Sequence, residues 1–206
     1  MSYSNFAKEF SNTRTYLWNC VKEFLNNNNK SEQKDLLEIG CGNGKNLLYA
    51  KELNYNITGF DICPEFVEEC KSKNLNVFID DMMTFKLNKK YNFILCIAAL
   101  HHLKPEYHLD ILVKLLDHLE ENGKILLTLW SYEIYDVKKP RKLLLGDNDI
   151  PWKNRKGEII GMRYYYVYNR ELLDSLLVKL QKIIPNIHLQ INYEQQNWVI
   201  QISYLT

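Results

Sequence analysis

Apolar residues along the chain follow two spacings, one typical of helices and one typical of buried strands. Short apolar runs at residues 35–39, 56–60 and 77–79 alternate with segments that have helical spacing. The run at residues 91–98 is continuously apolar, which indicates a strand buried on both faces. Strands that alternate with helices predict βαβ units and a parallel sheet.

The rest of the chain extends this alternation. We expect helices at residues 45–53, 64–72, 105–119 and 170–181, and further strands at residues 124–130, 187–193 and 197–204. Polar residues 194–196 join the last two strands, which predicts an antiparallel hairpin at one edge of the sheet. The whole pattern predicts an α/β fold with a doubly wound, mostly parallel seven-stranded sheet and a terminal antiparallel hairpin.

Two segments stand outside this alternation. Apolar residues at helical spacing predict an N-terminal helix over residues 4–25. Residues 131–168 interrupt the pattern and are predicted to form an inserted loop rich in aromatic residues. This insertion contains eight Lys and Arg residues against five Asp and Glu residues, so it is locally basic. It is either a solvated charged loop or a surface that binds phosphates and stacks on bases.

The composition is that of a globular protein. Of the 206 residues, 46% are hydrophobic and 25% are charged, which excludes a disordered or fibrous chain and suits a single domain. The formal net charge of +1 argues against bulk polycation binding to nucleic acid. The sequence has no apolar stretch typical of a signal peptide or a membrane helix, so we expect no membrane association.

The five cysteines give no sign of a metal site. None belongs to a C-x-x-C motif, and no Cys and His residues have zinc-finger spacing. Scattered cysteines in apolar segments are typical of reduced thiols in the core. We therefore expect a cytoplasmic or nuclear protein that itself holds no metal.

Alternate glycines follow the first predicted strand. Gly40, Gly42 and Gly44 come after Glu38 and allow the backbone to turn tightly and approach a ligand without an intervening Cβ. The dinucleotide fingerprint requires glycine at position 45, where this chain has Lys45. The spacing instead resembles the loop that binds S-adenosylmethionine. The alternative is a tight turn without a ligand.

Residues at the ends of the next strands extend this candidate site. Asp61 ends the second strand, where a carboxylate can accept hydrogen bonds from ribose hydroxyls. Asp81, with Asp80 as the alternative, follows the third strand, where a carboxylate can bind an adenine amino group. The carboxyl ends of parallel strands share one sheet edge, so we expect these groups to lie together. The predicted cofactor-binding residues are Glu38, Gly40, Gly42, Gly44, Asp61, Ile62, Asp81, Met82, Ile97 and Ala98.

A second group of residues follows the later strands. Two histidines come after the fourth predicted strand, a tryptophan ends the fifth, and an Arg-Tyr pair lies near the end of the insertion. Each has a structural alternative: a stacked or solvated histidine, a core residue at the sheet rim, or a Tyr-rich strand with an incidental arginine. An arginine near the N-terminus would alone be a solvated surface residue. These candidates are Arg14, His101, His102, Trp130, Arg163 and Tyr164.

Several short motifs occur in one order along the chain. They are Ser11-Asn-Thr-Arg14, the glycine loop at residues 38–46, Ile97-Ala-Ala-Leu-His-His-Leu103, Leu129-Trp130, Pro151-Trp152, Arg163-Tyr-Tyr165 and Asn197-Trp198. In this combination the chain resembles the eukaryotic tRNA wobble-uridine carboxymethyl methyltransferases over nearly its whole length. The glycine loop alone points only to the class I methyltransferase superfamily.

The resemblance implies an activity, a cofactor and partners. The activity is transfer of a methyl group from S-adenosylmethionine to the carboxylate of 5-carboxymethyluridine at the wobble position of the tRNA anticodon stem-loop. Arg14, His101, His102, Trp130, Arg163 and Tyr164 would then be the catalytic residues. A small zinc-binding activator subunit would pair with the apolar edge strand at residues 77–79 and form a heterodimer. The alternatives are a small-molecule O- or N-methyltransferase and a non-catalytic S-adenosylmethionine-binding subunit.

Overall fold

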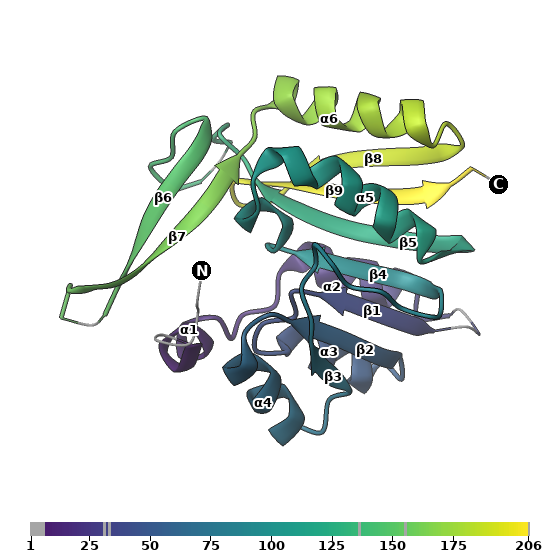
Figure 1. The fold of residues 1–206 in the computed structure, drawn as a ribbon, viewed down its shortest axis with the longest axis horizontal. Coiled ribbons are helices and arrows are strands. Elements are labelled where there is room, and N and C mark those ends of the chain that lie inside the picture. Colours follow the sequence, from purple (N-terminus) through teal and green to yellow (C-terminus); the bar gives the residue numbers. More distant parts are fainter. Residues whose placement is uncertain (1–6, 31, 33, 136, 155, 206) are drawn as a thin grey trace.

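The chain forms a seven-stranded main sheet with helices on both faces and a separate two-stranded hairpin (Figure 1). The computed structural model describes residues 7–205 apart from residues 31, 33, 136 and 155. Among these described residues, no helix is long and apolar enough to cross a lipid bilayer.

The main sheet has the strand order β3-β2-β1-β4-β5-β9-β8. Its strands are β1 (Asp35–Ile39), β2 (Asn56–Asp61), β3 (Val77–Ile79), β4 (Tyr91–Ile97), β5 (Leu119–Trp130), β8 (Ile187–Tyr193) and β9 (Asn197–Tyr204). The first five strands in this order are parallel, and β9 and β8 continue the sheet in antiparallel pairing. The predicted mostly parallel sheet with a terminal antiparallel hairpin is confirmed.

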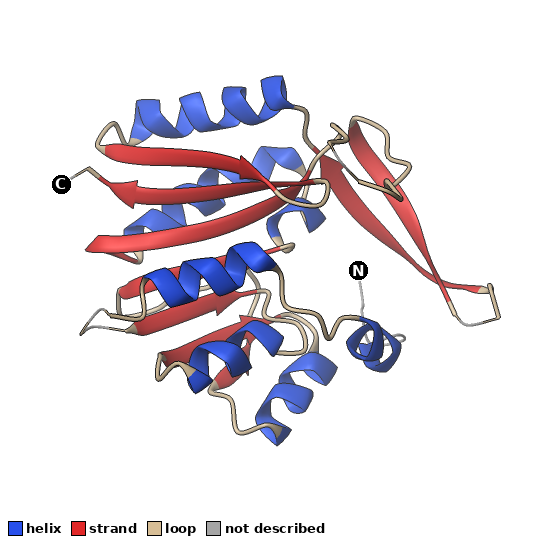
Figure 2. Ribbon diagram, turned by 180° about the vertical axis from the view of Figure 1, so that it is seen from behind, coloured by secondary structure: helices blue, strands red, loops and turns tan. Residues whose placement is uncertain are grey.

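Helices cover both faces of this sheet (Figures 1 and 2). They are α1 (Ala7–Thr13), α2 (Asn19–Asn27), α3 (Lys45–Glu52), α4 (Pro64–Ser72), α5 (His108–Asp117) and α6 (Arg170–Ile183), with short 3₁₀ turns η1 (Leu100–His102) and η2 (Pro105–Tyr107). One core packs β4 residues Phe93 and Leu95 against α2, α3 and α4. The other packs Ile94 and Cys96 against α5 and α6. Burial on both sides explains why this strand is continuously apolar.

The N-terminal segment forms two helices, so the prediction of one helix over residues 4–25 is wrong. Residues 4–6 of that prediction lie outside the described residues. α1 ends at Thr13 and α2 begins at Asn19. Residues 11–15 are Ser, Asn, Thr, Arg and Thr, and four of these five favour caps and turns or are β-branched, so the stretch lacks helix-stabilising side chains.

The second half of the insertion is a β-hairpin, so the prediction of a loop over residues 131–168 is wrong there, while the described residues between 132 and 145 form no helix or strand. β6 (Gly146–Lys153) pairs antiparallel with β7 (Ile159–Val167), and the hairpin projects from the end of the main sheet near α1 (Figures 1 and 2). Pro151 and the preceding Asp and Asn residues made β6 unrecognisable as a strand. Proline is tolerated there because β6 has β7 as its single neighbour and is therefore an edge strand.

Candidate active site

The glycine loop joins β1 to α3 and has an open outer side. Its three glycines have φ values between 52° and 73°, in the left-handed region that favours glycine. A Cβ on Gly44 would lie 2.6 Å from both Cys70 Sγ and Leu75 Cδ1, so a side chain there would displace its neighbours. A Cβ on Gly42 would meet only Phe10 Cε1, at 4.0 Å. The backbone at Gly42 is therefore accessible to a ligand.

Asp61 ends β2 and contacts this loop directly. Its Oδ2 accepts a hydrogen bond from the Gly42 N–H at 2.8 Å, and its Oδ1 accepts one from the Cys63 N–H at 2.9 Å. Burial raises the pKa of Asp61, while the backbone N–H groups favour its ionised form. An ionised carboxylate has about four acceptor sites, so both oxygens retain capacity for ribose hydroxyls.

Glu38 is a buried link between β1 and α3. The residue is 1% exposed, and its Oε1 accepts a hydrogen bond from Asn46 Nδ2 at 2.6 Å. Burial raises the pKa of Glu38 to about 8 despite the opposing effect of the Asn46 hydrogen bond. Glu38 was predicted to bind the cofactor, but the hydrogen bond that it accepts from Asn46 instead joins the two ends of the glycine loop. The raised pKa favours the protonated form of Glu38 at neutral pH.

The other predicted cofactor residues lie around the same sheet edge. Asp81 Oδ1 accepts a hydrogen bond from the backbone N–H of Met83 at 2.9 Å. Met82 Cε would lie 3.5 Å from a Cβ placed on Gly40. Ile62 is 54% exposed and offers apolar surface beside the polar groups, whereas Ile97 is buried in the core at the end of β4. An open glycine backbone, a carboxylate with spare acceptor capacity and apolar neighbours fit a nucleoside cofactor such as S-adenosylmethionine.

A strained residue ends β4 beside the glycine loop. Ala98 has φ 52°, which is uncommon for a residue with a Cβ. Its N–H donates to Oγ1 of the buried Thr128 at 2.8 Å, which holds this conformation. A Cβ on Gly40 would lie 2.7 Å from the Cβ of Ala99. The end of β4 therefore packs directly on the loop, and such strain is frequent at functional sites.

Seven side chains form a second group, which we call the aromatic–arginine cluster. Its members are His101, His102, Trp130, Arg141, Trp152, Arg163 and Tyr165. The Trp130 and Tyr165 rings stack with their centroids 3.8 Å apart and their planes inclined by 6°. The centroid of the Tyr165 ring lies 4.3 Å from that of His102 and 5.2 Å from that of His101. The cluster joins η1, the end of β5 and the β6–β7 hairpin.

Both histidines of the cluster are neutral at physiological pH. Burial, followed by the proximity of His102 and Arg141, lowers the pKa of His101 well below its usual value. Burial also lowers the pKa of His102 to about 4. The backbone N–H of Trp130 donates to Nδ1 of His101 at 3.2 Å, so this nitrogen carries no proton. The proton of His101 is therefore on Nε2, which is buried and has no hydrogen-bond partner among the described residues.

Three arginines converge on the rings of the cluster. The guanidinium carbon of Arg163 lies 4.6 Å from the Trp152 centroid; this arginine is 6% exposed, and its Nε has no partner among the described residues. Arg141 lies over Trp130 at 4.6 Å, and Arg14 lies over Trp152 at 5.5 Å. Among the described residues, no salt bridge joins these arginines to a carboxylate. This positive region suits an anionic ligand.

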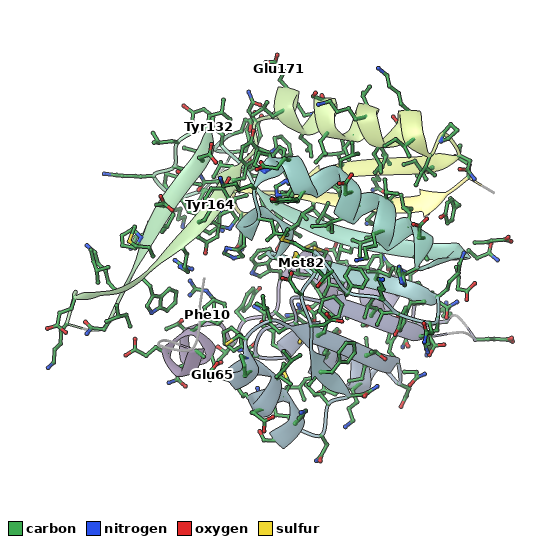
Figure 3. The ribbon with its side chains drawn as sticks, viewed as in Figure 1. Phe10, Glu65, Met82, Tyr132, Tyr164 and Glu171 are labelled. Atoms are coloured by element: carbon green, nitrogen blue, oxygen red, sulfur yellow. The ribbon has the colours of Figure 1, made fainter. Side chains whose placement is uncertain are left out.

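Phe10 in α1 connects the cluster to the glycine loop (Figure 3). Its ring centroid lies 5.7 Å from that of Trp152, and its Cε1 faces Gly42. α1 is held in this position by a hydrogen bond from Ser11 Oγ to Glu69 Oε2 at 2.5 Å. The two groups of residues therefore adjoin each other at the same end of the sheet.

The structure brings five of the six predicted substrate-side residues together. These are Arg14, His101, His102, Trp130 and Arg163. Tyr164 differs, because its hydroxyl donates to Asp147 Oδ1 at 2.5 Å, outside the cluster, and only its carbonyl oxygen accepts a hydrogen bond from His102 Nδ1, at 3.0 Å. Tyr165, which was not predicted, supplies the ring that stacks on Trp130.

Three members of the cluster, Arg141, Trp152 and Tyr165, were not among the predicted site residues. Side chains alternate along a strand, so Arg163 and Tyr165 share one face of β7 and Tyr164 lies on the other. Recognition of β7 as a strand would have identified Tyr165. Arg141 is one of eight basic residues in the insertion, and only its contacts with residues distant in sequence single it out.

Two known tRNA methyltransferases are similar in sequence to this chain. A tRNA (carboxymethyluridine(34)-5-O)-methyltransferase from Schizosaccharomyces pombe is 27% identical over 220 residues, which cover 95% of this chain and 91% of that protein. The protein named tRNA (carboxymethyluridine(34)-5-O)-methyltransferase ALKBH8 from Macaca fascicularis is 28% identical over 156 residues, which cover 75% of this chain but 23% of that longer protein.

A solved structure supports the fold. The crystal structure of an S-adenosylmethionine-dependent methyltransferase from Clostridium acetobutylicum ATCC 824 superposes with a TM-score of 0.68 and covers 99% of both chains at 16% identity. Residues 12–178 match the family described as "Methyltransferase domain", a span that contains the glycine loop, Asp61 and the whole aromatic–arginine cluster. This match confirms the expected cofactor, S-adenosylmethionine, and the chain belongs to the methyltransferase domain family.

Proposed function

We propose that the chain transfers a methyl group from S-adenosylmethionine to the carboxylate of 5-carboxymethyluridine at the wobble position of a tRNA anticodon. One observation carries this proposal: Arg141 and Arg163 lie over the two rings of the stacked Trp130–Tyr165 pair, and Arg14 lies over the neighbouring Trp152. Among the described residues, no carboxylate pairs with these arginines. A carboxylate on a planar base would supply the complementary charge and a ring to pack against aromatic side chains. The names of the two relatives support this choice of substrate.

The residue types suit esterification of a carboxylate. A carboxyl group with a pKa of about 4 is ionised at neutral pH, so the transfer needs no strong general base. S-adenosylmethionine supplies the methyl group on an activated sulfonium. Arg163 can bind the carboxylate through two parallel hydrogen bonds, and Nε2 of the neutral His101 can donate another. Both residues would act by aligning a carboxylate oxygen for in-line attack.

The β6–β7 hairpin offers a surface for the rest of the RNA. It projects from the main sheet and carries exposed Lys153 and Lys156 near its tip (Figure 1). Exposed Tyr132 and Tyr135 lie in the segment that leads into it. Basic side chains bind phosphates and aromatic side chains stack on unpaired bases, so the hairpin suits an anticodon stem-loop.

The direct test uses a synthetic anticodon stem-loop that contains 5-carboxymethyluridine, together with methyl-labelled S-adenosylmethionine. We expect label in a methyl ester, which mild alkali releases. A matched stem-loop with the neutral carbamoylmethyl group in place of the carboxylate should acquire no label. Equal labelling of both RNAs, or labelling of neither while a small carboxylic acid is methylated, would contradict the proposal.

We also propose that a small zinc-binding subunit covers the free edge of β3. β3 is an edge strand, and Ile79 and Met83 beside this edge are 54% and 39% exposed. An apolar strand edge is a site of uncontrolled pairing unless it is covered. Among the described residues, no three His, Cys, Asp or Glu side chains are placed to hold a metal ion, so the zinc would belong to the partner.

Co-expression with such a subunit tests the interface. Ile79→Lys should abolish co-purification, because it places a charge on the exposed edge. Ile183→Lys on α6 is a matched control, since Ile183 is also 54% exposed. Phe78 is a poorer probe, because its ring packs 5.7 Å from the Phe60 ring and belongs partly to the core. Retention of the partner by Ile79→Lys would exclude this edge.

A further inference from the structure

The aromatic–arginine cluster holds more positive charge than one carboxylate can balance. Arg14 and Arg163 both lie over Trp152, and Arg141 lies over Trp130. Desolvation, followed by the proximity of Arg163, lowers the pKa of Arg14. His101 and His102 add no charge, because both are neutral. S-adenosylmethionine has one carboxylate of its own, so a substrate with a single carboxylate would still leave at least one of the three guanidinium groups without an anionic partner. The arrangement therefore calls for a ligand with more than one anionic group.

Arg141 is fixed in the cluster by the turn between β8 and β9. Its backbone N–H donates to Gln196 Oε1 at 2.6 Å, and Gln196 Nε2 donates to the Arg141 carbonyl oxygen at 3.1 Å. Its Nη1 donates to the Gln196 carbonyl oxygen at 2.7 Å and to Asn197 Oδ1 at 3.5 Å. Gln196 is 1% exposed and has φ 60°. A buried side chain in a left-handed turn thus clamps the backbone of Arg141.

The guanidinium of Arg141 retains donors for a ligand. Among the described residues, all of its side-chain hydrogen bonds come from Nη1, and a guanidinium has five N–H donors in total. Burial lowers the pKa of Arg141 to about 10, so the group remains charged at neutral pH. A half-buried cation without an acidic partner is costly unless an anion binds it.

The three arginines differ in depth, which assigns them different anions. Arg163 is buried against Tyr165, whose ring neighbours His101, so it is placed for the carboxylate. Arg141 is half-buried over Trp130, and Arg14 is exposed. In RNA, the anions next to a base are its flanking phosphodiesters.

We infer that Arg141 binds a phosphodiester flanking the methyl-accepting nucleotide and that Gln196 positions it for this contact. This inference rests on the proposed function for the identity of the RNA. Arg141 would then determine the position of the base without taking part in methyl transfer. The substrate class is a nucleotide within a chain and not a free nucleoside.

Binding measurements in the presence of S-adenosylhomocysteine test this inference without any turnover. The probes are the carboxymethyluridine stem-loop and two copies in which a neutral methylphosphonate replaces the phosphodiester on either side of the modified nucleotide. For Arg141→Gln we expect a Kd for the unmodified backbone roughly tenfold higher than that of the wild type. We also expect the plot of the logarithm of the association constant against the logarithm of the salt concentration to be less steep for Arg141→Gln than for the wild type, by about 0.7 in slope.

The decisive result is whether the effects of the Arg141 substitution and of a methylphosphonate on the Kd are coupled or additive. One methylphosphonate should weaken binding by the wild type and have no further effect on Arg141→Gln. Gln196→Asn tolerates the left-handed backbone but has a shorter side chain, and it should reproduce both effects in a protein that is still folded at the temperature of the binding measurement. The control Arg170→Gln removes an exposed arginine that is already paired with Asp174 at 2.8 Å, and it should bind like the wild type.

Additive losses at both methylphosphonates, or wild-type binding by Arg141→Gln, would overturn the inference. Methyl transfer is measured separately on the unmodified stem-loop. Coupling without transfer would support the phosphate contact while refuting the proposed function. Methyl transfer without coupling would support the proposed function and refute the phosphate contact.

Discussion

Arg163 lies with its guanidinium carbon 4.6 Å from the centroid of the Trp152 ring. Tyr165 lies near the same group, with its ring centroid at 5.1 Å. The two rings, together with a hydrogen bond from Arg163 Nη1 to the Tyr165 hydroxyl at 2.5 Å, fix the orientation of this planar cation. A lysine at this position keeps the charge but loses both the planar stacking and the two-pronged geometry.

We predict that Arg163→Lys lowers kcat/KM for the carboxymethylated RNA by roughly ten- to a hundred-fold, the usual range for a hydrogen bond to a charged group. The Kd for S-adenosylmethionine should stay unchanged, because Arg163 contacts the aromatic–arginine cluster and not the glycine loop. Steady-state kinetics and calorimetry measure the two quantities. A weaker cofactor Kd with unchanged kcat would assign Arg163 to the cofactor instead.

His101 should act as a hydrogen-bond donor and not as a base. Because Nδ1 accepts the Trp130 N–H, the Nε2 proton is available at every pH above the lowered pKa of the ring. We predict a kcat that is independent of pH between about 6 and 8, a range that brackets the ordinary histidine pKa of about 6.5. We further predict that His101→Ala lowers kcat by roughly a hundred-fold. A kcat that rises through a pKa of about 6.5 would identify His101 as a general base.

The sequence was sufficient to predict features that depend on neighbouring residues. The strand β4 was recognisable because burial on both faces requires a continuous apolar run, and the glycine loop because a ligand-accessible turn requires alternate glycines. Three features could not be recognised in this way: the break after Thr13, the strand β6 with Pro151, and the clamp of Arg141 by Gln196. The last two depend on edge position or on contacts across tens of residues, which local periodicity does not record. The break after Thr13 instead follows from the side chains of residues 11–15, which do not stabilise a helix.

The glycine loop offers a matched pair of substitutions. Gly42→Ala and Gly44→Ala both place alanine at a positive φ, but only the second meets Cys70 Sγ and Leu75 Cδ1 at 2.6 Å. Overpacking of a core costs about 1–3 kcal/mol, so Gly44→Ala should lose that much more unfolding free energy than Gly42→Ala. Gly42→Ala should instead weaken binding of S-adenosylmethionine, because its Cβ occupies the open side of the loop. Urea unfolding and calorimetry distinguish these effects, and equal unfolding free energies would refute the assignment.

The buried carboxyl group of Glu38 should make stability depend on pH. Burial raises its pKa to about 8 in the folded protein, whereas an unfolded chain has a Glu pKa of about 4.3. Between these values the folded state binds more protons than the unfolded state. The contribution of Glu38 to stability is therefore complete below about pH 4.3 and is lost as the pH rises, by at most about 1.4 kcal/mol per pH unit.

Glu38→Gln should remove this dependence, because an amide oxygen can still accept the hydrogen bond from Asn46 but does not ionise. We predict that the unfolding free energy of the variant relative to the wild type increases by about 2 kcal/mol between pH 6 and pH 8. Urea denaturation at the two pH values measures this difference. The effect of histidine titration on the unfolding free energy cancels in the comparison, because both proteins contain the same histidines. Glu52→Gln at the exposed end of α3 is the control and should show no such increase. Unfolding free energies that differ by the same amount at both pH values would mean that Glu38 is already ionised in the folded protein.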